Sequence, residues 1–386
     1  MSIAWRSPHS VTIHNQSKAY PGYTLVDPMH TSDVWLIDME GYFVHRWKLP
    51  TIPRNHGVLL PNGNLLYATA APITESESER QPLPKGWGMG AGLIEMDWES
   101  NLVWKYVDPY QSHTFWRMEN GNTMILTAVV VPDDIAARVQ GGIPGTEESG
   151  VMWADGFHEV APDGEVIWEW SAGDHLDPDI DIMCPLEIRG DWIHANSCVV
   201  LPDGNILTSF RNTSTLCIIE RATGNITWRW GPGEISHQHD PRPLGNGNIL
   251  VFDNGGHRPG STISYSRVVE VNPSTDKIEW EYKADPPESF YSALISGCQR
   301  LSNGNTLICE GQKGRIFEVT PDGEIVWEFI NPFYAYHPWT SYFGCSNLMF
   351  RAYRYEEDYE GLKGRKLDPK DLDLVNRIYG PVAFRE

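Results

Sequence analysis

The chain has 386 residues, and its 51 acidic and 30 basic side chains give a formal net charge of −21. Such a charge opposes non-specific binding to nucleic acid or to an anionic membrane surface. The N-terminal sequence has no apolar core of signal-peptide length, and no later segment approaches the ~20 apolar residues of a membrane span. Composition therefore predicts a cytoplasmic protein with no nucleic-acid partner and no membrane partner.

Tryptophan recurs at the ends of segments of similar length. The intervals between these tryptophans run from 47 to 64 residues, the size of one four-stranded propeller blade with a loop. Six positions are each predicted to close one blade: Trp47, Trp104, Trp168, Trp228, Trp280 and Trp327. The sequence therefore predicts an all-β fold, a single six-bladed β-propeller domain over residues 1–386 with four-stranded antiparallel blades.

The blades follow from hairpins in chain order. Residues 34–47 show one hairpin only, so the inner strands of the first blade are expected from nearby N-terminal sequence and from a C-terminal clasp and tail, residues 347–386. Each later unit has a leading hairpin with an Asn-Gly or Asp-Gly turn, and then a hairpin that ends at the tryptophan. The leading hairpins are residues 56–69, 113–128, 194–211, 239–254 and 298–311. The long segments 72–90 and 132–150 are expected to form loops around one end of the propeller.

Histidine marks four of the leading strands. His56, His113, His194 and His239 each stand shortly before the turn. The leading strand of a blade is normally innermost, so these side chains are expected to face the central channel. One such histidine is more often a satisfied polar residue at a blade end, but four at equivalent positions favour a site.

Turn arithmetic places other side chains at the same channel end. If the Asp-Gly and Asn-Gly centres are two-residue turns, Arg211 lies opposite Asn196 and Asn254 lies opposite His239. His237 stands two residues before His239, so it points the same way, nearer the mouth. Arginine matches sulfate, phosphate or carboxylate with a planar fork, and neutral histidine can act as a nucleophile or carry protons near pH 7. The set therefore predicts a site for an oxyanion.

Several motifs in the middle of the chain resemble one enzyme family. They are His-Ala-Asn-Ser at 194–197, Ser-Phe-Arg-Asn-Thr-Ser-Thr at 209–215, Trp-Arg-Trp-Gly at 228–231, Gln-His-Asp-Pro-Arg at 238–242 and Phe-Asp-Asn at 252–254. With the opening Ala-Tyr-Pro-Gly-Tyr at 19–23, they are similar to the arylsulfotransferase-like family. The resemblance implies a six-bladed propeller that moves a sulfuryl group from a phenolic sulfate ester to another phenol, with no nucleotide sulfate donor and no cofactor.

The resemblance also implies roles for individual residues. His239 is the histidine that would be sulfated transiently, and His194, Asn196 and Arg211 would hold the sulfate oxygens. His113 matches the remaining family histidine. Substrate contacts are further expected from His56, His237, Arg242 and Asn254, with an aromatic or sulfated small molecule as the substrate.

Two other interpretations remain open from the sequence. The four histidines His56, His113, His194 and His239 could instead bind a divalent metal such as Mn²⁺ or Fe²⁺ for lyase, hydrolase or hydratase chemistry on an oxygenated small molecule. A non-enzymatic binding platform is the third interpretation.

The six cysteines show no Cys-x-x-Cys spacing and are too few for a disulfide scaffold in a chain of this length. A two-residue turn at Asn303-Gly304 would place Cys298 opposite Cys309. We expect that pair to be buried and reduced.

Overall fold

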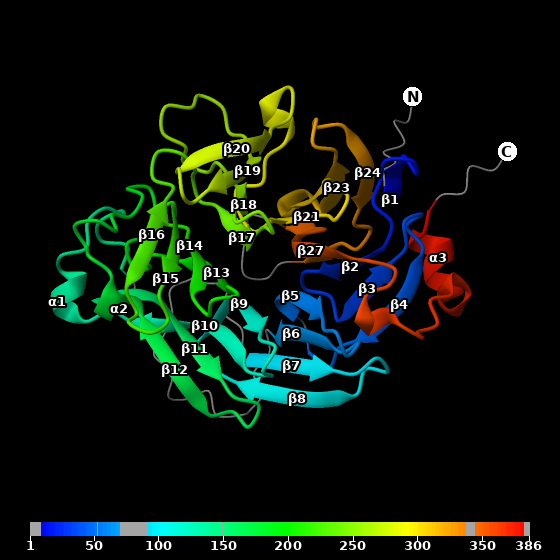
Figure 1. The fold of residues 1–386 in the computed structure, drawn as a ribbon, viewed down its shortest axis with the longest axis horizontal. Helices are drawn as coiled ribbons and strands as arrows, with labels where there is room; N and C mark the ends of the chain where they lie inside the picture. Colours follow the sequence, from blue (N-terminus) through cyan, green and yellow to red (C-terminus); the bar gives the residue numbers. More distant parts are fainter. Residues whose placement is uncertain (1–8, 52, 70–91, 148–149, 337–343, 382–386) are drawn as a thin grey trace.

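The computed structural model describes residues 9–51, 53–69, 92–147, 150–336 and 344–381. Six antiparallel sheets of four or five strands surround a common centre in this part of the chain (Figure 1). The predicted six-bladed propeller with four-stranded blades is therefore confirmed.

The first blade joins the two ends of the chain. Its order from the centre outward is β27 (Met349–Tyr355), β2 (Tyr23–Pro28), β3 (Asp33–Ile37) and β4 (Phe43–Lys48). The inner strands thus come from C-terminal and N-terminal sequence, as the single hairpin at 34–47 predicted.

The other five blades follow in chain order, each with its first strand innermost. The second blade consists of β5 (Pro53–Leu59), β6 (Leu65–Thr69), β7 (Gly92–Met96) and β8 (Leu102–Val107). The third consists of β9 (Gln111–Arg117), β10 (Thr123–Val130), β11 (Trp153–Val160) and β12 (Val166–Ser171). The fourth consists of β13 (Ala195–Val200), β14 (Ile206–Phe210), β15 (Thr215–Ile219) and β16 (Ile226–Trp230). The fifth consists of β17 (His239–Pro243), β18 (Ile249–Asp253), β19 (Arg267–Asn272) and β20 (Lys277–Tyr282).

The sixth blade carries an additional outer strand. It contains β21 (Gly297–Arg300), β22 (Thr306–Glu310), β23 (Arg315–Val319) and β24 (Ile325–Ile330), and β1 (Ser10–His14) pairs with β24. A small separate sheet pairs β25 (Ala335–Tyr336) with β26 (Cys345–Ser346). An unpaired strand edge invites other chains to pair with it, so β1 shields the outer edge of this blade.

Short helices lie outside the blades. They are α1 (Asp133–Ala136), α2 (Ala172–His175), η2 (Pro287–Ser289), η3 (Gly311–Lys313), η4 (Glu360–Leu362), η5 (Pro369–Leu372) and α3 (Asp373–Tyr379). The last three lie in the C-terminal segment, residues 347–386, that the sequence predicted as a clasp and tail. Asn376 of α3 accepts from the Phe43 amide at 2.8 Å and donates to the Phe43 carbonyl oxygen at 2.9 Å. The helix therefore satisfies backbone groups on the outer strand of the first blade.

The repeated tryptophan links one blade to the next. In five blades its indole Nε1 donates a hydrogen bond to the outer turn of the following blade, at 2.8 to 3.1 Å. The bond from Trp327 to the Met39 carbonyl oxygen joins the sixth blade to the first. Trp47 differs, because its buried Nε1 makes no hydrogen bond with any described residue. Apolar clusters fill the spaces between neighbouring blades, as between β13–β16 and β17–β20.

The leading hairpins have three-residue turns, which corrects the predicted register. In the fourth blade the Leu201 amide bonds to the Asn205 carbonyl, and Gly204 has φ of +87°. This geometry is a tight turn with a glycine bulge, so every pair moves by one residue relative to a two-residue turn. Irregular pairing between Ala195 and Cys198 moves the register once more, and Ala195 lies opposite Phe210. The predicted pairing of Asn196 with Arg211 is therefore wrong.

The same shift applies in the other blades. His239 lies opposite Phe252 rather than Asn254, and Cys298 lies opposite Ile308 rather than Cys309. All six cysteines are free, and Cys298 and Cys309 are buried.

Candidate active site

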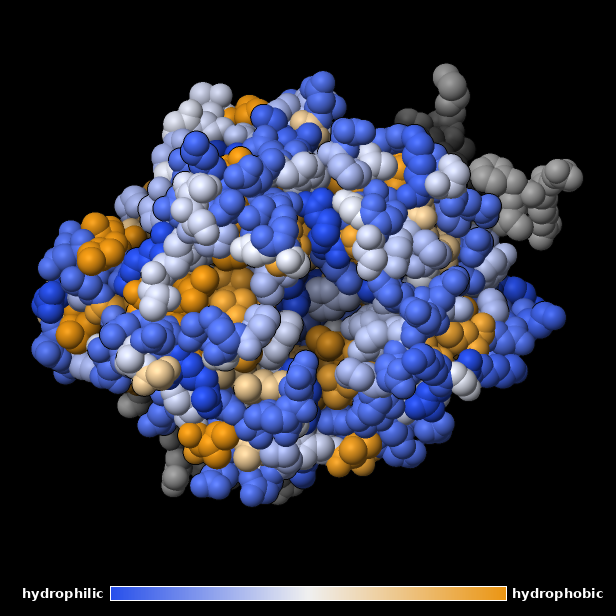
Figure 2. Space-filling model, in the orientation of Figure 1, coloured by the Kyte–Doolittle hydropathy of each residue, from blue (hydrophilic) through white to orange (hydrophobic). Residues whose placement is uncertain are grey.

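Three of the predicted histidines gather where the leading strands begin. His113 lies in β9, His194 directly precedes β13, and His239 is the first residue of β17. The imidazole rings of His113 and His194 meet edge to face, with centroids 4.5 Å apart. One face of the ring of blades is hollowed near its centre (Figure 2).

The backbone is unusual at this end of the channel. His113, His194 and His237 have φ of +28°, +47° and +58°, a region that residues other than glycine rarely occupy. Pairing is irregular beside each of the three strands β9, β13 and β17. Such bulges re-aim side chains next to functional sites, and the strain persists only where the surroundings impose it.

His239 has a defined tautomer. Its Nδ1 lies 2.8 Å from Asn254 Oδ1 and 3.2 Å from the His237 carbonyl oxygen. The amide of Asn254 is oriented in turn, because its Nδ2 donates to the carbonyl oxygens of Ser292 and Ile295 at 2.7 and 2.9 Å. Both neighbours of Nδ1 are acceptors, so Nδ1 carries the hydrogen and Nε2 keeps its lone pair. Although the predicted pairing failed, Asn254 does contact His239.

Burial sets the charge state of His239. The side chain is buried, and this burial is the main cause that holds its pKa well below the ordinary value. The positive charges of Arg211 and Arg351 lower the pKa further. The imidazole is therefore neutral near pH 7, which is the form that a nucleophilic nitrogen requires.

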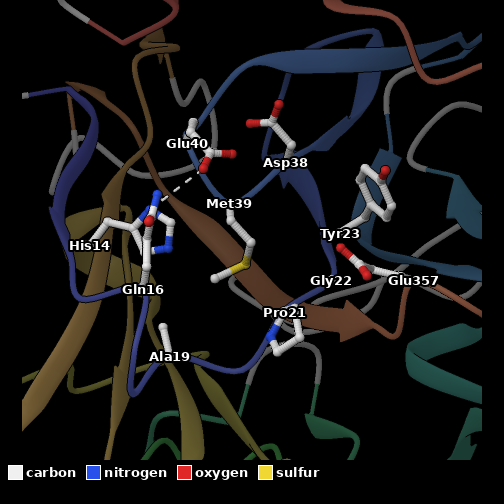
Figure 3. Close-up of a pocket in the computed structure, with 10 residues that line it drawn as sticks. All are labelled: His14, Gln16, Ala19, Pro21, Gly22, Tyr23, Asp38, Met39, Glu40 and Glu357. Atoms are coloured by element: carbon white, nitrogen blue, oxygen red, sulfur yellow. Dashed lines mark ion pairs between the residues drawn. The ribbon is translucent and has the colours of Figure 1, made fainter.

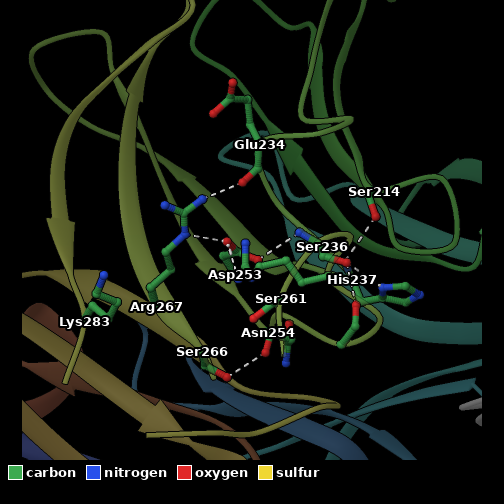
Figure 4. A network of polar contacts seen from close by, with 12 residues as sticks. Ser214, Glu234, Ser236, His237, Asp253, Asn254, Ser261, Ser266, Arg267 and Lys283 are labelled. Atoms are coloured by element: carbon green, nitrogen blue, oxygen red, sulfur yellow. Dashed lines mark hydrogen bonds and ion pairs between the residues drawn. The ribbon is translucent and has the colours of Figure 1, made fainter. Parts of the chain in front are cut away.

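A hydrogen-bond network fixes the segment before His239 (Figure 4). The carboxylate of Asp253 accepts from the Ser236 amide at 2.9 Å and from the side chains of Arg258 and Arg267 at 2.9 and 2.7 Å. Ser266 Oγ donates to the Asn254 carbonyl oxygen at 2.7 Å. The loop that carries the histidines is therefore tied to β18 and β19.

His194 and His113 each have a polar partner at Nδ1. His194 Nδ1 forms a short hydrogen bond with the Asp191 carboxylate, and His113 Nδ1 lies 2.6 Å from Ser112 Oγ. The carboxylate orients the imidazole of His194, and the serine hydroxyl orients that of His113. Both rings are proton carriers of the kind that the site needs beside His239.

Arg211 and Asn196 also lie at this end, but each has a structural partner. Arg211 Nη1 donates to Glu187 at 3.0 Å and to Asn212 at 2.8 Å, while its buried Nε makes no hydrogen bond with the described residues. Asn196 Nδ2 donates to the Gln238 carbonyl oxygen at 2.8 Å. Asn196 thus braces the backbone just before His239.

The strand β27 fills the middle of the channel with a charged layer. Arg351 is buried and donates to Thr114 Oγ1 and to the Asn196 carbonyl oxygen, at 3.2 and 2.6 Å. It also lies 3.4 Å from Asp240, whose carboxylate pairs with Arg242 at 2.9 Å. A Cβ at position 297 would stand 2.4 Å from Asp240 Oδ2, so only glycine leaves room for this carboxylate.

The structure separates His56 and Arg242 from the other predicted residues. Both line a pocket of about 460 Å³ at the turn ends of the leading strands, together with Trp116, Tyr353 and Tyr355. The His56 ring stacks between Phe115 and Phe350, with centroids 5.0 and 5.6 Å away. Burial holds the pKa of His56 well below its ordinary value. None of His113, His194 and His239 lines this pocket at the turn end, although the His113 ring also contacts Phe350, with centroids 6.3 Å apart.

His237 points toward residues that the sequence analysis did not select. Its Nε2 lies 2.9 Å from Glu187 Oε1, and its ring meets the ring of His257 at 4.8 Å. Cys184 Sγ lies 3.5 Å from His257 Nδ1. Cys184, Glu187 and Asp191 belong to the irregular segment between α2 and β13, which has neither strand periodicity nor a repeat motif.

One group of side chains in the described part of the chain brings three metal-binding atoms within 4.8 Å of one another. Its members are Cys184, His237 and His257. The four histidines considered for a metal from the sequence, His56, His113, His194 and His239, do not form such a group among the described residues.

A second pocket lies away from the channel (Figure 3). It has a volume of about 380 Å³ between β1 and the first blade, and His14, Asp38, Glu40 and Glu357 are among its lining residues. Burial raises the pKa of Asp38 to about 6. None of the predicted site residues lines this pocket.

Of the two segments predicted as loops, the structure describes only one. Segment 72–90 lies outside the described residues. Segment 132–150, described except at 148 and 149, contains α1 and a bridge from Ile143 to Ile188. Arg189, in the connection between α2 and β13, forms an ion pair with Glu147 at 2.8 Å and so joins that connection to segment 132–150. Among the described residues, no helix is long and apolar enough to cross a membrane.

Comparisons with known proteins agree with the motifs. The chain shares 16% identity and a TM-score of 0.51 with a solved protein of unknown function from Bacteroides caccae, over 80% of this chain and 93% of that one. A streptogramin B lyase structure gives 12% identity and a TM-score of 0.45, over 86% and 85% of the two chains. No curated protein matches. The family model described as arylsulfotransferase (ASST) matches residues 73–332, about two thirds of the sequence. The chain therefore belongs to the arylsulfotransferase family.

Proposed function

We propose that this protein transfers a sulfuryl group from an aryl sulfate to a phenolic acceptor, with Nε2 of His239 as the nucleophile. The observation that carries this proposal is the hydrogen bond from His239 Nδ1 to Asn254 Oδ1 at 2.8 Å. It leaves a neutral imidazole with a free lone pair at Nε2, inside a channel that also holds two arginines.

The first half of the reaction forms an N–S bond and breaks the S–O bond to the phenol. Nε2 of His239 supplies the electron pair, and the phenolate leaves with the electrons of the broken bond. His194 or His113, whose rings adjoin, donates a proton to the phenolate oxygen. In the second half the acceptor phenol gives its proton to the imidazole of His194 or His113 that donated one in the first half. The phenol oxygen then attacks sulfur, and the N–S bond breaks, which frees His239.

Sulfuryl transfer resembles phosphoryl transfer, because positioning and stabilisation of oxygen charge dominate over covalent chemistry. Arg211 has an unpartnered Nε for this task, since its Nη1 bonds to Glu187 and Asn212. Its bond to Glu187 orients the guanidinium and also offsets part of its charge. Arg351 adds a second positive charge near His239. The carboxylate of Asp240 offsets part of this charge.

The direct test uses 4-nitrophenyl sulfate with phenol as the acceptor. We expect phenol-dependent release of nitrophenol from the purified full-length protein. Without an acceptor, intact-mass analysis should show one added sulfuryl group, absent from His239→Asn. A protein that neither turns over nor becomes modified with a panel of aryl sulfates would contradict the proposal.

A further inference from the structure

Three side chains that the proposed transfer does not use converge beside the channel mouth, together with Glu187, the partner of Arg211. Cys184 Sγ and one ring nitrogen each of His237 and His257 lie within 4.8 Å of one another. Glu187 Oε1 lies 2.9 Å from His237 Nε2 and 3.5 Å from His257 Nδ1. They come from two segments distant in sequence, 184–187 and 237–257.

The lone pair of His237 is directed into this cluster. Ser236 Oγ donates to the Gly256 carbonyl oxygen, so it accepts at its other side from His237 Nδ1 at 3.1 Å. In the neutral imidazole this arrangement places the hydrogen on Nδ1 and the lone pair on Nε2. His237 is 1% exposed, and its Nε2 makes no hydrogen bond of good geometry with the described residues, although Glu187 is close. A buried, unpartnered nitrogen of this kind calls for a ligand.

Two of the three spacings in the cluster match those of a tetrahedral zinc site, and the third, from His237 Nε2 to Glu187 Oε1, is shorter at 2.9 Å. Zinc bonds of 2.0–2.3 Å to nitrogen, oxygen and sulfur imply edges of about 3.3–3.8 Å between ligand atoms. The distance from Cys184 Sγ to His257 Nδ1 is 3.5 Å, as is the distance from His257 Nδ1 to Glu187 Oε1. One thiolate, two imidazoles and a carboxylate form a donor set that zinc prefers over magnesium or calcium.

We propose that Cys184, His237 and His257 bind one Zn²⁺ ion, with Glu187 or a solvent molecule as the fourth ligand. His237 anchors the buried side of the site, and the half-exposed Cys184 and exposed His257 give the ion a path from solvent.

Metal content after reconstitution tests the proposal without reference to transferase activity. The chelator-stripped full-length protein is incubated with Zn²⁺, desalted and analysed by mass spectrometry of metals. We expect one equivalent in the wild type. Cys184→Ser and His257→Gln should bind Zn²⁺ at least about 100-fold more weakly, because loss of a ligand costs more than loss of an outer-shell partner. The matched controls Cys345→Ser and His14→Gln should bind as the wild type does.

Substitution of Co²⁺ for Zn²⁺ tests by absorption spectroscopy whether a thiolate binds the metal. A thiolate-to-cobalt absorption band should appear in the wild type and be absent from Cys184→Ser. Circular dichroism of the stripped proteins establishes that each variant is folded. Retention of Zn²⁺ by both cluster variants, no retention by the wild type, or equal loss in the controls would overturn the proposal.

Discussion

The two ends of the propeller channel are lined by the same leading strands but carry different chemistry. At the end where the strands begin, His113, His194 and His239 meet with irregular backbone and engaged polar partners. At the turn end, His56 and Arg242 stand among aromatic rings in a pocket of about 460 Å³. The layer of Arg351 and Asp240 lies between them.

This difference shows how position along one strand decides the role of a side chain. The turn ends pair regularly up to their three-residue turns, so their side chains pack as the pleat dictates. The starting ends follow long connections, and their bulges turn several polar groups toward one point. An active site is therefore favoured where the strands begin.

The largest effect that would sharpen this comparison is expected from His239→Asn. Asparagine cannot form the N–S bond, so turnover should fall by about 10⁴-fold or more. Steady-state assays with 4-nitrophenyl sulfate and phenol measure the loss. His158→Asn, on the outer part of the third blade, serves as the control. Full activity of His239→Asn would remove this residue as the nucleophile.

The next effect is expected from Arg211→Lys. A lysine keeps the charge but loses the planar fork and the Nε donor, so kcat should fall on the order of 10²-fold. Arg221→Lys changes an arginine in an outer turn of the fourth blade and should leave kcat near the wild-type value. Equal effects of the two substitutions would show that Arg211 has no special role.

A paired substitution tests the two ends against each other. His113→Gln removes a proton carrier beside His194 and should lower kcat by about 10²-fold. His56→Gln changes a ring stacked between two phenylalanines, and we expect a loss below about tenfold that arises from packing. An equal fall in kcat for His113→Gln and His56→Gln would show that the two ends of the channel act as one site.

Sequence periodicity predicted the blades because the repeated tryptophan has a repeated task. Five of the six indoles bond to the next blade, so the spacing of Trp280 or Trp327 records the size of a blade. The register was less predictable, since a glycine bulge and a two-residue turn share the same Asn-Gly or Asp-Gly letters. The predicted cross-strand partner of Cys298 was Cys309, and the actual partner is the preceding residue, Ile308.

The site was predictable only where it lies on the repeats. The sequence placed four histidines together in the channel; His113, His194 and His239 lie near the starts of their strands, whereas His56 lines the pocket at the turn end. His56 stands four residues before Leu60, where its turn begins, whereas His239 stands five residues before Leu244. His56 therefore lies one residue, about 3.3 Å along the strand, nearer to its turn than His239 does.

Other residues of the site carry no local signal. Cys184 and Glu187 lie in an irregular connection, and Arg351 arrives from the C-terminal strand. Contacts between segments so distant in sequence depend on the closed ring of blades.

A last difference concerns buried carboxylates. Asp191 and Glu187 at the histidine end have cationic or imidazole partners. Asp27 of β2, beside Gly57, is fully buried, and neither oxygen makes a hydrogen bond of good geometry with the described residues. Burial raises its pKa to about 8, more than the nearby Gly57 amide lowers it.

The folded state therefore keeps the proton of Asp27 up to about pH 8, whereas the unfolded chain releases it near pH 4. The unfolded state binds fewer protons in this window, so the contribution of Asp27 to stability should fall as pH rises, by up to about 1.4 kcal/mol per pH unit. Asp27→Asn should reduce the pH slope of the unfolding free energy by that amount in denaturant-unfolding curves measured at pH 5, 6, 7 and 8, while the raised pKa values of Asp38 and Asp155 leave a remaining slope. The exposed-site control Glu99→Gln should keep the full slope, and an unchanged slope in Asp27→Asn would show that Asp27 does not titrate in this window.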